Sequence, residues 1–201
     1  NMAKSRPGER RTSARTMHFI WIVDASGSMT VDAKMQTLNN AIDESIPAMR
    51  DVAEENTFAK IKVRVVTFSS GARWHVSQPT PVADFTWTDV EPKGVTDLGA
   101  AFKLVAEEMT VEKMGKDGFP PVLVLATDGQ ATDNWKAGLE ALMATPWGKR
   151  ASRIGIAIGQ DADESLLQEF IGNIEFPVLR ADNPQRLVTL IRWASSVVSQ
   201  A

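Results

Sequence analysis

The sequence contains no cysteine and no long apolar run. Without cysteine the chain forms neither a disulfide framework nor a thiolate zinc site, and it fits a reducing compartment. No apolar stretch approaches the roughly 18 residues that span a bilayer, and the N-terminus lacks the hydrophobic stretch of a signal peptide. We therefore expect a soluble, cytoplasmic protein that does not act at a membrane.

Basic charge is concentrated at the N-terminus, although the whole chain has a net charge of −3. Residues 1–16 contain five lysine or arginine side chains and one glutamate, with almost nothing apolar to bury, so we expect a flexible basic tail. The rest of the chain is acidic and shows no basic cluster, so we expect no nucleic-acid partner. With 43% hydrophobic residues overall, residues 17–201 suffice for one domain.

Short apolar segments alternate with helical patterns along this domain. The strand-like segments are 17–23, 61–68, 121–127, 153–158 and 177–179, with 72–76 as a short antiparallel edge strand. Helical spacing marks 35–49, 98–109, 135–143, 163–171 and 183–198, and we expect Pro47 to kink or break the first helix. This alternation predicts an α/β fold: a doubly wound, mainly parallel sheet with helices on both faces.

Oxygen-bearing side chains follow two predicted strands and precede one predicted helix. Asp24, Ser26 and Ser28 stand at alternate positions after the first strand, Asp128 follows the strand 121–127, and Thr96 lies just before the helix that begins at 98. The carboxyl ends of parallel strands meet at one edge of a sheet, so we expect these side chains to lie close together. Their hard oxygens suit Mg²⁺, with Mn²⁺ or Ca²⁺ as alternatives.

The order Asp-x-Ser-x-Ser, then a distant Thr, then a distant Asp resembles the complete metal-ion-dependent adhesion site (MIDAS) of the von Willebrand factor type A (vWA) domain. In this sequence those positions are Asp24, Ser26, Ser28, Thr96 and Asp128. The similarity covers residues 17–201, and among relatives the chain is most similar to bacterial intracellular members of the TerY type, associated with tellurite resistance and stress response. The resemblance implies a Rossmann-like vWA fold and a protein-protein interaction module.

The resemblance also implies a role for each residue. The hydroxyls of Ser26 and Ser28 contact the metal directly and that of Thr96 does so in at least one state, whereas Asp24 and Asp128 act largely through water. A metal with no directly bound carboxylate keeps much of its positive field for an incoming one. We therefore expect it to bind an Asp or Glu carboxylate of a partner protein.

Other interpretations of the same residues stay open at this stage. Ser28, Thr96 and Asp128 each suit a helix cap, and Asp97 suits either a third site carboxylate or a solvated position in the first turn of a helix. Trp87 and Trp135 either surround the metal site as secondary contacts or pack their loops against the domain. The metal is then either part of a binding site or purely structural in a scaffold.

Motifs of common enzyme classes are missing. The sequence has no Gly-x-x-x-x-Gly-Lys phosphate loop, and Asp24 stands where a Gly-x-Ser-x-Gly elbow needs its first glycine. A phosphatase with an aspartyl nucleophile needs Asp-x-Asp, and here the second position is Ser26. The only histidines, His18 and His75, have no metal-ligand spacing, and we interpret both as structural. We expect no enzymatic activity, with a Mg²⁺-dependent phosphohydrolase as the alternative.

Overall fold

The first strand begins slightly earlier than the sequence pattern predicts. The computed structural model describes residues 15–173, 176–183, 185–190 and 192–193, so most of the expected tail at 1–16 lies outside the described residues. β1 (Arg15–Asp24) includes the last two tail residues, and the N–H of Arg15 donates to the carbonyl of Phe58 at 2.9 Å. Backbone pairing needs no apolar side chain, so a prediction from hydrophobicity alone placed the start of this strand two residues too late.

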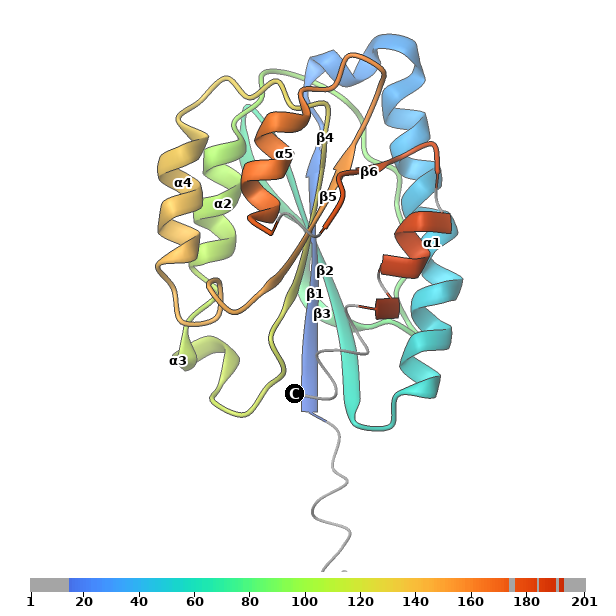
Figure 1. Cartoon of the computed structure of the whole chain (residues 1–201), viewed down its shortest axis with the longest axis vertical. Coiled ribbons are helices and arrows are strands. Elements are labelled where there is room, and N and C mark those ends of the chain that lie inside the picture. Colours follow the sequence, from blue (N-terminus) through green and yellow to red (C-terminus); the bar gives the residue numbers. More distant parts are fainter. Residues whose placement is uncertain (1–14, 174–175, 184, 191, 194–201) are drawn as a thin grey trace, which may run out of the picture.

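Six strands form one sheet in the order β3-β2-β1-β4-β5-β6 (Figure 1). They are β1, β2 (Ala59–Ser69), β3 (Gly71–Pro81), β4 (Val122–Thr127), β5 (Ser152–Ala157) and β6 (Leu179–Arg180). Every neighbouring pair is parallel except β2 and β3, which are antiparallel. The edge strand is therefore of the predicted type, but it is not short. The second half of β3 is polar and partly exposed, so a search for apolar runs does not predict it.

Helices cover both faces of the sheet, as expected for a doubly wound α/β fold. α1 (Lys34–Glu55) lies on one face, and α2 (Leu98–Ala106), α4 (Trp135–Met143) and α5 (Glu164–Ile171) lie on the other (Figure 1). Two short helices, η2 (Gly27–Ala33) and α3 (Val111–Met114), were not predicted. Within the predicted last helix, residues 185–190 and 192–193 are helical and residue 183 is not, whereas 184, 191 and 194–198 lie outside the described residues. No helix among the described residues has both the length and the apolar character needed to cross a bilayer.

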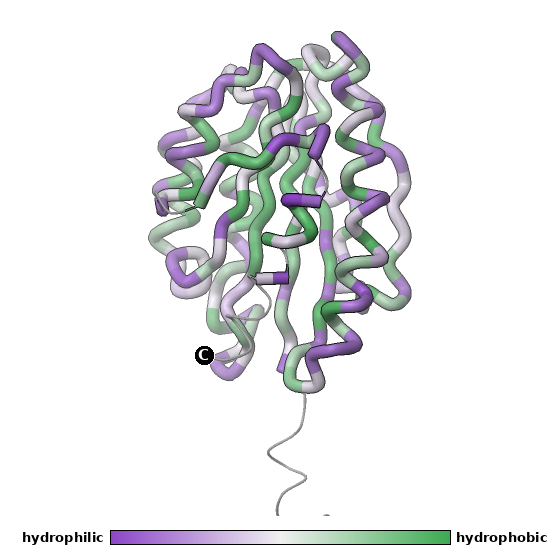
Figure 2. The backbone as a smooth tube through the Cα atoms, turned by 45° about the vertical axis from the view of Figure 1, so that its right-hand side comes forward, coloured by the Kyte–Doolittle hydropathy of each residue, from purple (hydrophilic) through white to green (hydrophobic). Residues whose placement is uncertain are grey.

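β1 is buried on both sides because its side chains alternate between two apolar layers. The strands form a largely apolar centre between helices of mixed character (Figure 2). Met17, Phe19, Trp21 and Val23 belong to the same core layer as Leu38, Ile42 and Ile46 of α1, whereas Ile20 and Ile22 belong to the layer of Phe102 and Phe170. These layers fix β1 in register, so the residue that ends it is held firmly at the sheet edge.

Pro47 does not break the first helix, which was one of the two effects we expected of it. α1 runs without interruption from Lys34 to Glu55 with Pro47 inside it. Pro47 and Asp43, whose carbonyl loses its helical donor, are both exposed, so water can hydrate that carbonyl. Ile42 and Ile46 meanwhile stay buried against the sheet. Burial of the inner face therefore outweighs the cost of proline on the outer face.

We expect Pro47→Ala to stabilise the protein. Alanine restores the N–H that proline lacks and has a far higher helix propensity, so the free energy of unfolding should rise by about 1–3 kcal/mol. Urea denaturation of both proteins measures this change, and an unchanged or lower midpoint would contradict it.

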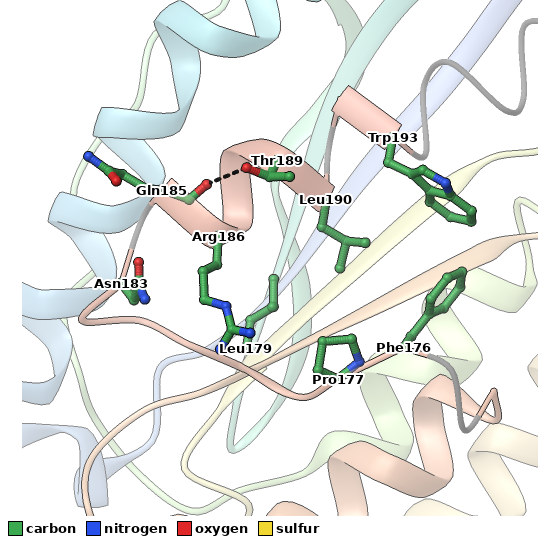
Figure 3. A pocket seen from close by; sticks show the side chains of 9 residues that line it. All are labelled: Phe176, Pro177, Leu179, Asn183, Gln185, Arg186, Thr189, Leu190 and Trp193. Carbon is green, nitrogen blue, oxygen red and sulfur yellow. Dashed lines mark hydrogen bonds between the residues drawn. The ribbon is translucent and has the colours of Figure 1, made fainter.

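An open hollow of about 730 Å³ lies between β6 and the last described helical residues. Phe176, Leu179, Leu190 and Trp193 line it, and the side chain of Arg186 extends along it (Figure 3). The rings of Phe176 and Trp193 meet edge to face with their centroids 4.8 Å apart. None of the five predicted metal ligands lines this hollow, so it is separate from the candidate metal site.

Candidate metal site

β1 and β4 bring two buried carboxylates to the same edge of the sheet. Asp24 is the last residue of β1, Asp128 directly follows β4, and both are fully buried. The hydroxyl of Thr127, the last residue of β4, donates to Asp24 Oδ2 at 2.7 Å and so connects the two strand ends. The juxtaposition predicted from the parallel pairing is therefore present, at the end of the sheet where β1 leads into η2 (Figure 1).

Ser26 and Ser28 form a compact hydroxyl cluster with Asp24. Ser26 donates to Asp24 Oδ1 twice, from its backbone N–H at 2.9 Å and from its hydroxyl at 2.5 Å. The hydroxyls of Ser26 and Ser28 lie 3.0 Å apart. Ser26 precedes η2, yet its side chain makes no capping hydrogen bond. The hydrogen bonds of these two hydroxyls thus serve the cluster, and helix capping does not explain them.

The loop that carries Thr96 joins the other two segments of the site. The N–H of Gly27 donates to the carbonyl of Gly94 at 2.7 Å, which ties this loop to the Asp24 segment. The N–H of Thr132 donates to the carbonyl of Thr96 at 2.9 Å, and the Thr96 N–H donates to the Thr132 hydroxyl at 3.1 Å. Thr96 is itself buried. The structure thus assembles all three sequence segments at one edge.

Asp97 has a different role from either of those considered. It is half-buried, and its Oδ2 accepts a hydrogen bond from the N–H of Gly71 at 2.6 Å. This bond fastens the Thr96 loop to the turn between β2 and β3. The first turn of α2 is capped instead by Asp133, which accepts from the N–H groups of Gly99 and Ala100 at 3.0 and 3.1 Å. Asp97 is therefore a loop anchor.

Trp87 and Trp135 both pack against the domain. The indole N–H of Trp87 donates to Asn39 Oδ1 of α1 at 3.0 Å, and its ring borders the core layer on the α1 side. Trp135 begins α4 and borders the opposite core layer. These contacts support the interpretation that both rings hold their loops in place.

Lys34 belongs to the site, although sequence reasoning missed it. Its side chain is only 3% exposed, and its Nζ lies 3.6 Å from Asp128 Oδ2 and 2.9 Å from Asp161 Oδ1. Burial lowers the pKa of this ammonium, but the hydrogen bond to Asp161 and the charges of Asp128 and Asp161 outweigh that effect and raise its pKa. A lysine at the start of an amphipathic helix usually points to solvent, so its position gave no signal.

The electrostatics of the site favour a bound cation. Burial raises the pKa of Asp24, the charge of Asp128 raises it further, and hydrogen bonds from Ser26 and Thr127 oppose both effects. Asp128 Oδ2 is buried and has no hydrogen-bond partner among the described residues; its nearest cation is the Lys34 ammonium. A buried carboxylate oxygen without a hydrogen-bond partner among the described residues, near a second carboxylate that accepts from the Ser26 hydroxyl, offers the kind of oxygen donors that Mg²⁺ accepts.

The chemistry of these donors also indicates which kind of cation would suit the candidate site. Within the part of the chain that the structure describes, no three His, Cys, Asp or Glu side chains gather around one point. A metal held here would therefore depend on hydroxyl oxygens as well as the two carboxylates. Hard cations bind such oxygens, whereas softer transition metals favour imidazole or thiolate.

Gly129, next to Asp128, controls the shape of this loop. Its φ is +83°, and an added Cβ would collide with the backbone of Asp163. We expect Gly129→Ala to lower the free energy of unfolding by about 2–4 kcal/mol, because backbone strain adds to a clash that no side chain can relieve. Gly71→Ala is the matched control: φ there is +79° with no atom within 4 Å, so about 1 kcal/mol of strain is expected. Equal losses in urea denaturation would contradict this account.

The family assignment follows from sequence comparison. Residues 20–192 match the family model of the von Willebrand factor type A domain, so the chain belongs to that family. Domains of this family generally mediate metal-dependent protein interactions. None of the curated proteins matches the sequence.

Solved structures support the same fold. A von Willebrand factor type A protein from Catenulispora acidiphila superposes with a TM-score of 0.63 at 16% identity, covering 91% of this chain and 42% of that protein. BatB from Bacteroides thetaiotaomicron gives a TM-score of 0.62 at 14% identity, over 92% of this chain and all (100%) of that protein. Proximal thread matrix protein 1 from the mussel byssus, with a zinc-occupied MIDAS motif, gives 0.63 at 18% identity, over 89% of this chain. Our chain spans about half (48%) of the mussel protein's length.

Proposed function

We propose that this domain binds a partner protein through a divalent cation held by Asp24, Ser26, Ser28, Thr96 and Asp128. Mg²⁺ is the favoured ion, with Mn²⁺ and Ca²⁺ as alternatives. The observation that carries the proposal is the buried Asp128 Oδ2, which has no hydrogen-bond partner among the described residues and lies beside the hydroxyl-bonded carboxylate of Asp24.

In this proposal, the carboxylates and the hydroxyls of the site make different contributions to metal binding. The carboxylates of Asp24 and Asp128 supply negative charge from buried positions, and the hydroxyls of Ser26, Ser28 and Thr96 supply neutral oxygens. When bound, the metal supplies a positive field that attracts an Asp or Glu carboxylate of the partner. Ser28 is partly exposed, which leaves a path for such a side chain. The hydrogen-bonded loops keep these oxygens in place before the partner arrives.

We further propose that the domain acts by binding and not by catalysis. Both histidines of the chain lie in strands, His18 in β1 and His75 in β3, so the site has no imidazole base. On the basis of the resemblance to TerY-type members, we propose that the domain works in a bacterial cytoplasmic stress-response complex of the tellurite-resistance type. The absence of cysteine is compatible with such a reducing interior.

The test is the metal dependence of partner binding. A pull-down with and without chelator identifies the partner, and its affinity is then measured in Mg²⁺ and in EDTA. Without the metal, Asp24 and Asp128 face the partner's carboxylate, so attraction turns into repulsion and affinity should fall by several kcal/mol. Equal affinities in Mg²⁺ and EDTA would rule out the mechanism.

Thr96→Ala tests the hydroxyl contribution separately. It removes one oxygen ligand and little core volume, so we expect weaker partner binding with an intact fold. The control is Thr189→Ala, which removes an exposed hydroxyl from the last helical segment and should leave affinity unchanged. Circular dichroism of both variants confirms that neither change unfolds the domain.

A further inference from the structure

The candidate metal site already contains a cation, the ammonium of Lys34. It reaches Asp128 Oδ2, the oxygen that has no hydrogen-bond partner among the described residues. On its other side it contacts both oxygens of Asp161, at 2.9 and 3.2 Å. Lys34 therefore bridges a fully buried carboxylate of the site and a carboxylate outside it that is 61% exposed.

The local backbone holds Lys34 in this position at some cost. Asp32 and Ala33, directly before it, have left-handed φ angles of 51° and 56°, a conformation that non-glycine residues rarely adopt. The side chain then passes against Gly159, where an added Cβ would lie 2.6 Å from Lys34 Cε. Strain of about 1–3 kcal/mol per residue persists only where the surroundings enforce it. The chain thus accepts strain in the segment that brings the ammonium to Asp128.

We infer that Lys34 competes with the metal for Asp128 and sets the metal affinity of the site. This inference rests on the proposed metal site and adds a residue that controls how tightly that site binds. In the metal-free protein the ammonium neutralises part of the charge of Asp128. A metal that shares this carboxylate must bind against the repulsion of the ammonium. Both effects weaken metal binding, so removal of the ammonium should strengthen it.

Asp161 acts in the opposite direction. Its carboxylate attracts the ammonium away from Asp128, and its own charge favours a nearby metal. Removing this charge leaves Asp128 as the sole carboxylate of the described residues in contact with Lys34, so the metal should bind more weakly. Because Asp161 is largely exposed, its effect should be smaller than that of Lys34.

The experiment measures Mg²⁺ and Mn²⁺ affinity by calorimetry with the metal salts alone. For Lys34→Met, which keeps the length of the side chain but not its charge, we expect at least about tenfold tighter binding. For Asp161→Asn we expect binding about two- to fivefold weaker. The matched control is Lys60→Met, which removes an exposed lysine near the start of β2, at the opposite end of the sheet, and should leave the affinity close to wild type.

Thermal unfolding gives a second measurement that needs no metal titration. In EDTA, Lys34→Met leaves Asp128 buried without a cation, so its melting temperature should fall below that of the wild type. Saturating Mg²⁺ should raise the melting temperature of the variant more than that of the wild type. If Lys34→Met proves unfolded in EDTA, Asp161→Asn still tests the inference, because its exposed position spares the fold.

The possible outcomes separate this inference from the proposed function. Unchanged or weaker metal binding by Lys34→Met, in a protein whose wild type binds metal, would overturn the role of Lys34 and leave the metal site standing. Stronger binding by Asp161→Asn would also overturn it. Failure of the wild type to bind either metal would overturn both the metal site and the role of Lys34.

Discussion

The double substitution Asp24→Ala, Asp128→Ala is expected to abolish Mg²⁺ binding. We expect the wild type to bind about one ion per chain, because the structure brings the three segments that carry the five oxygen-bearing side chains to one edge of the sheet. Without the two buried carboxylates only neutral hydroxyls remain, and these cannot compete with the strong hydration of Mg²⁺. Calorimetry with Mg²⁺ measures both proteins.

The matched control for that experiment is Asp84→Ala, Asp117→Ala. It removes the same number of carboxylates from exposed positions outside the site, so Mg²⁺ binding should persist at the wild-type stoichiometry. Circular dichroism of both double variants verifies that they are folded. Equal binding by the wild type and the Asp24, Asp128 variant would show that the metal lies elsewhere.

Acid should destabilise the protein through His18. The pKa of this imidazole is lowered from 6.5 to about 4, chiefly by burial and also by the positive charges of Arg64 and Lys62, with Glu108 partly opposing them. The unfolded chain therefore binds a proton between pH 6.5 and 4 that the native protein does not. The stability that neutral His18 confers is present above about pH 6.5 and is lost as the pH falls towards 4, by about 2–3 kcal/mol.

A variant without this imidazole isolates the effect from other acid-sensitive groups. His18→Gln should flatten the pH dependence of the free energy of unfolding between pH 6.5 and 4, measured by urea denaturation at a series of pH values. His75→Gln removes the other histidine, which lies on the edge strand, and controls for the loss of an imidazole as such. A wild-type pH slope in His18→Gln would refute the assignment.

The parts of the fold that were predictable from the sequence are those whose burial is two-sided. The apolar runs that became β1, β2, β4 and β5 are buried on both faces, and a continuous apolar run is the signature of such strands. β3 extends well beyond the predicted 72–76. The sequence pattern missed its later residues because they are exposed or half-exposed, although their backbone still pairs with β2. The effect of Pro47 on the helix was also hard to predict, because it depends on which face of the helix the proline occupies.

The residues of the candidate site also differ in how far the sequence predicts their positions. The proximity of the segments that carry Asp24, Ser26, Ser28, Thr96 and Asp128 was predictable, because the topology brings two strand ends and one helix start to the same edge of the sheet. The role of these residues as metal ligands stays a prediction. The position of Lys34 was not predictable, because its contact with Asp128 depends on two residues with left-handed φ angles, and no local sequence pattern predicts those angles. Asp97 and Asp133 illustrate the same limit. The hydrogen bond from Gly71 to Asp97 and the capping of α2 by Asp133 both join residues far apart in the sequence, so no local pattern predicts them.

The long edge strand also bears on how copies of this chain meet one another. An exposed edge offers unpaired backbone groups on which a strand from a second molecule can grow, and long flat edges of this kind promote aggregation. β3 is poorly suited to such growth. The second half of β3 contains the exposed residues Ser77 and Gln78, and Pro79 has no N–H to donate. The register between β3 and β2 also shifts on both sides of Val65. At the other edge, β6 has only two residues. Both edges therefore protect the sheet against strand-to-strand polymerisation.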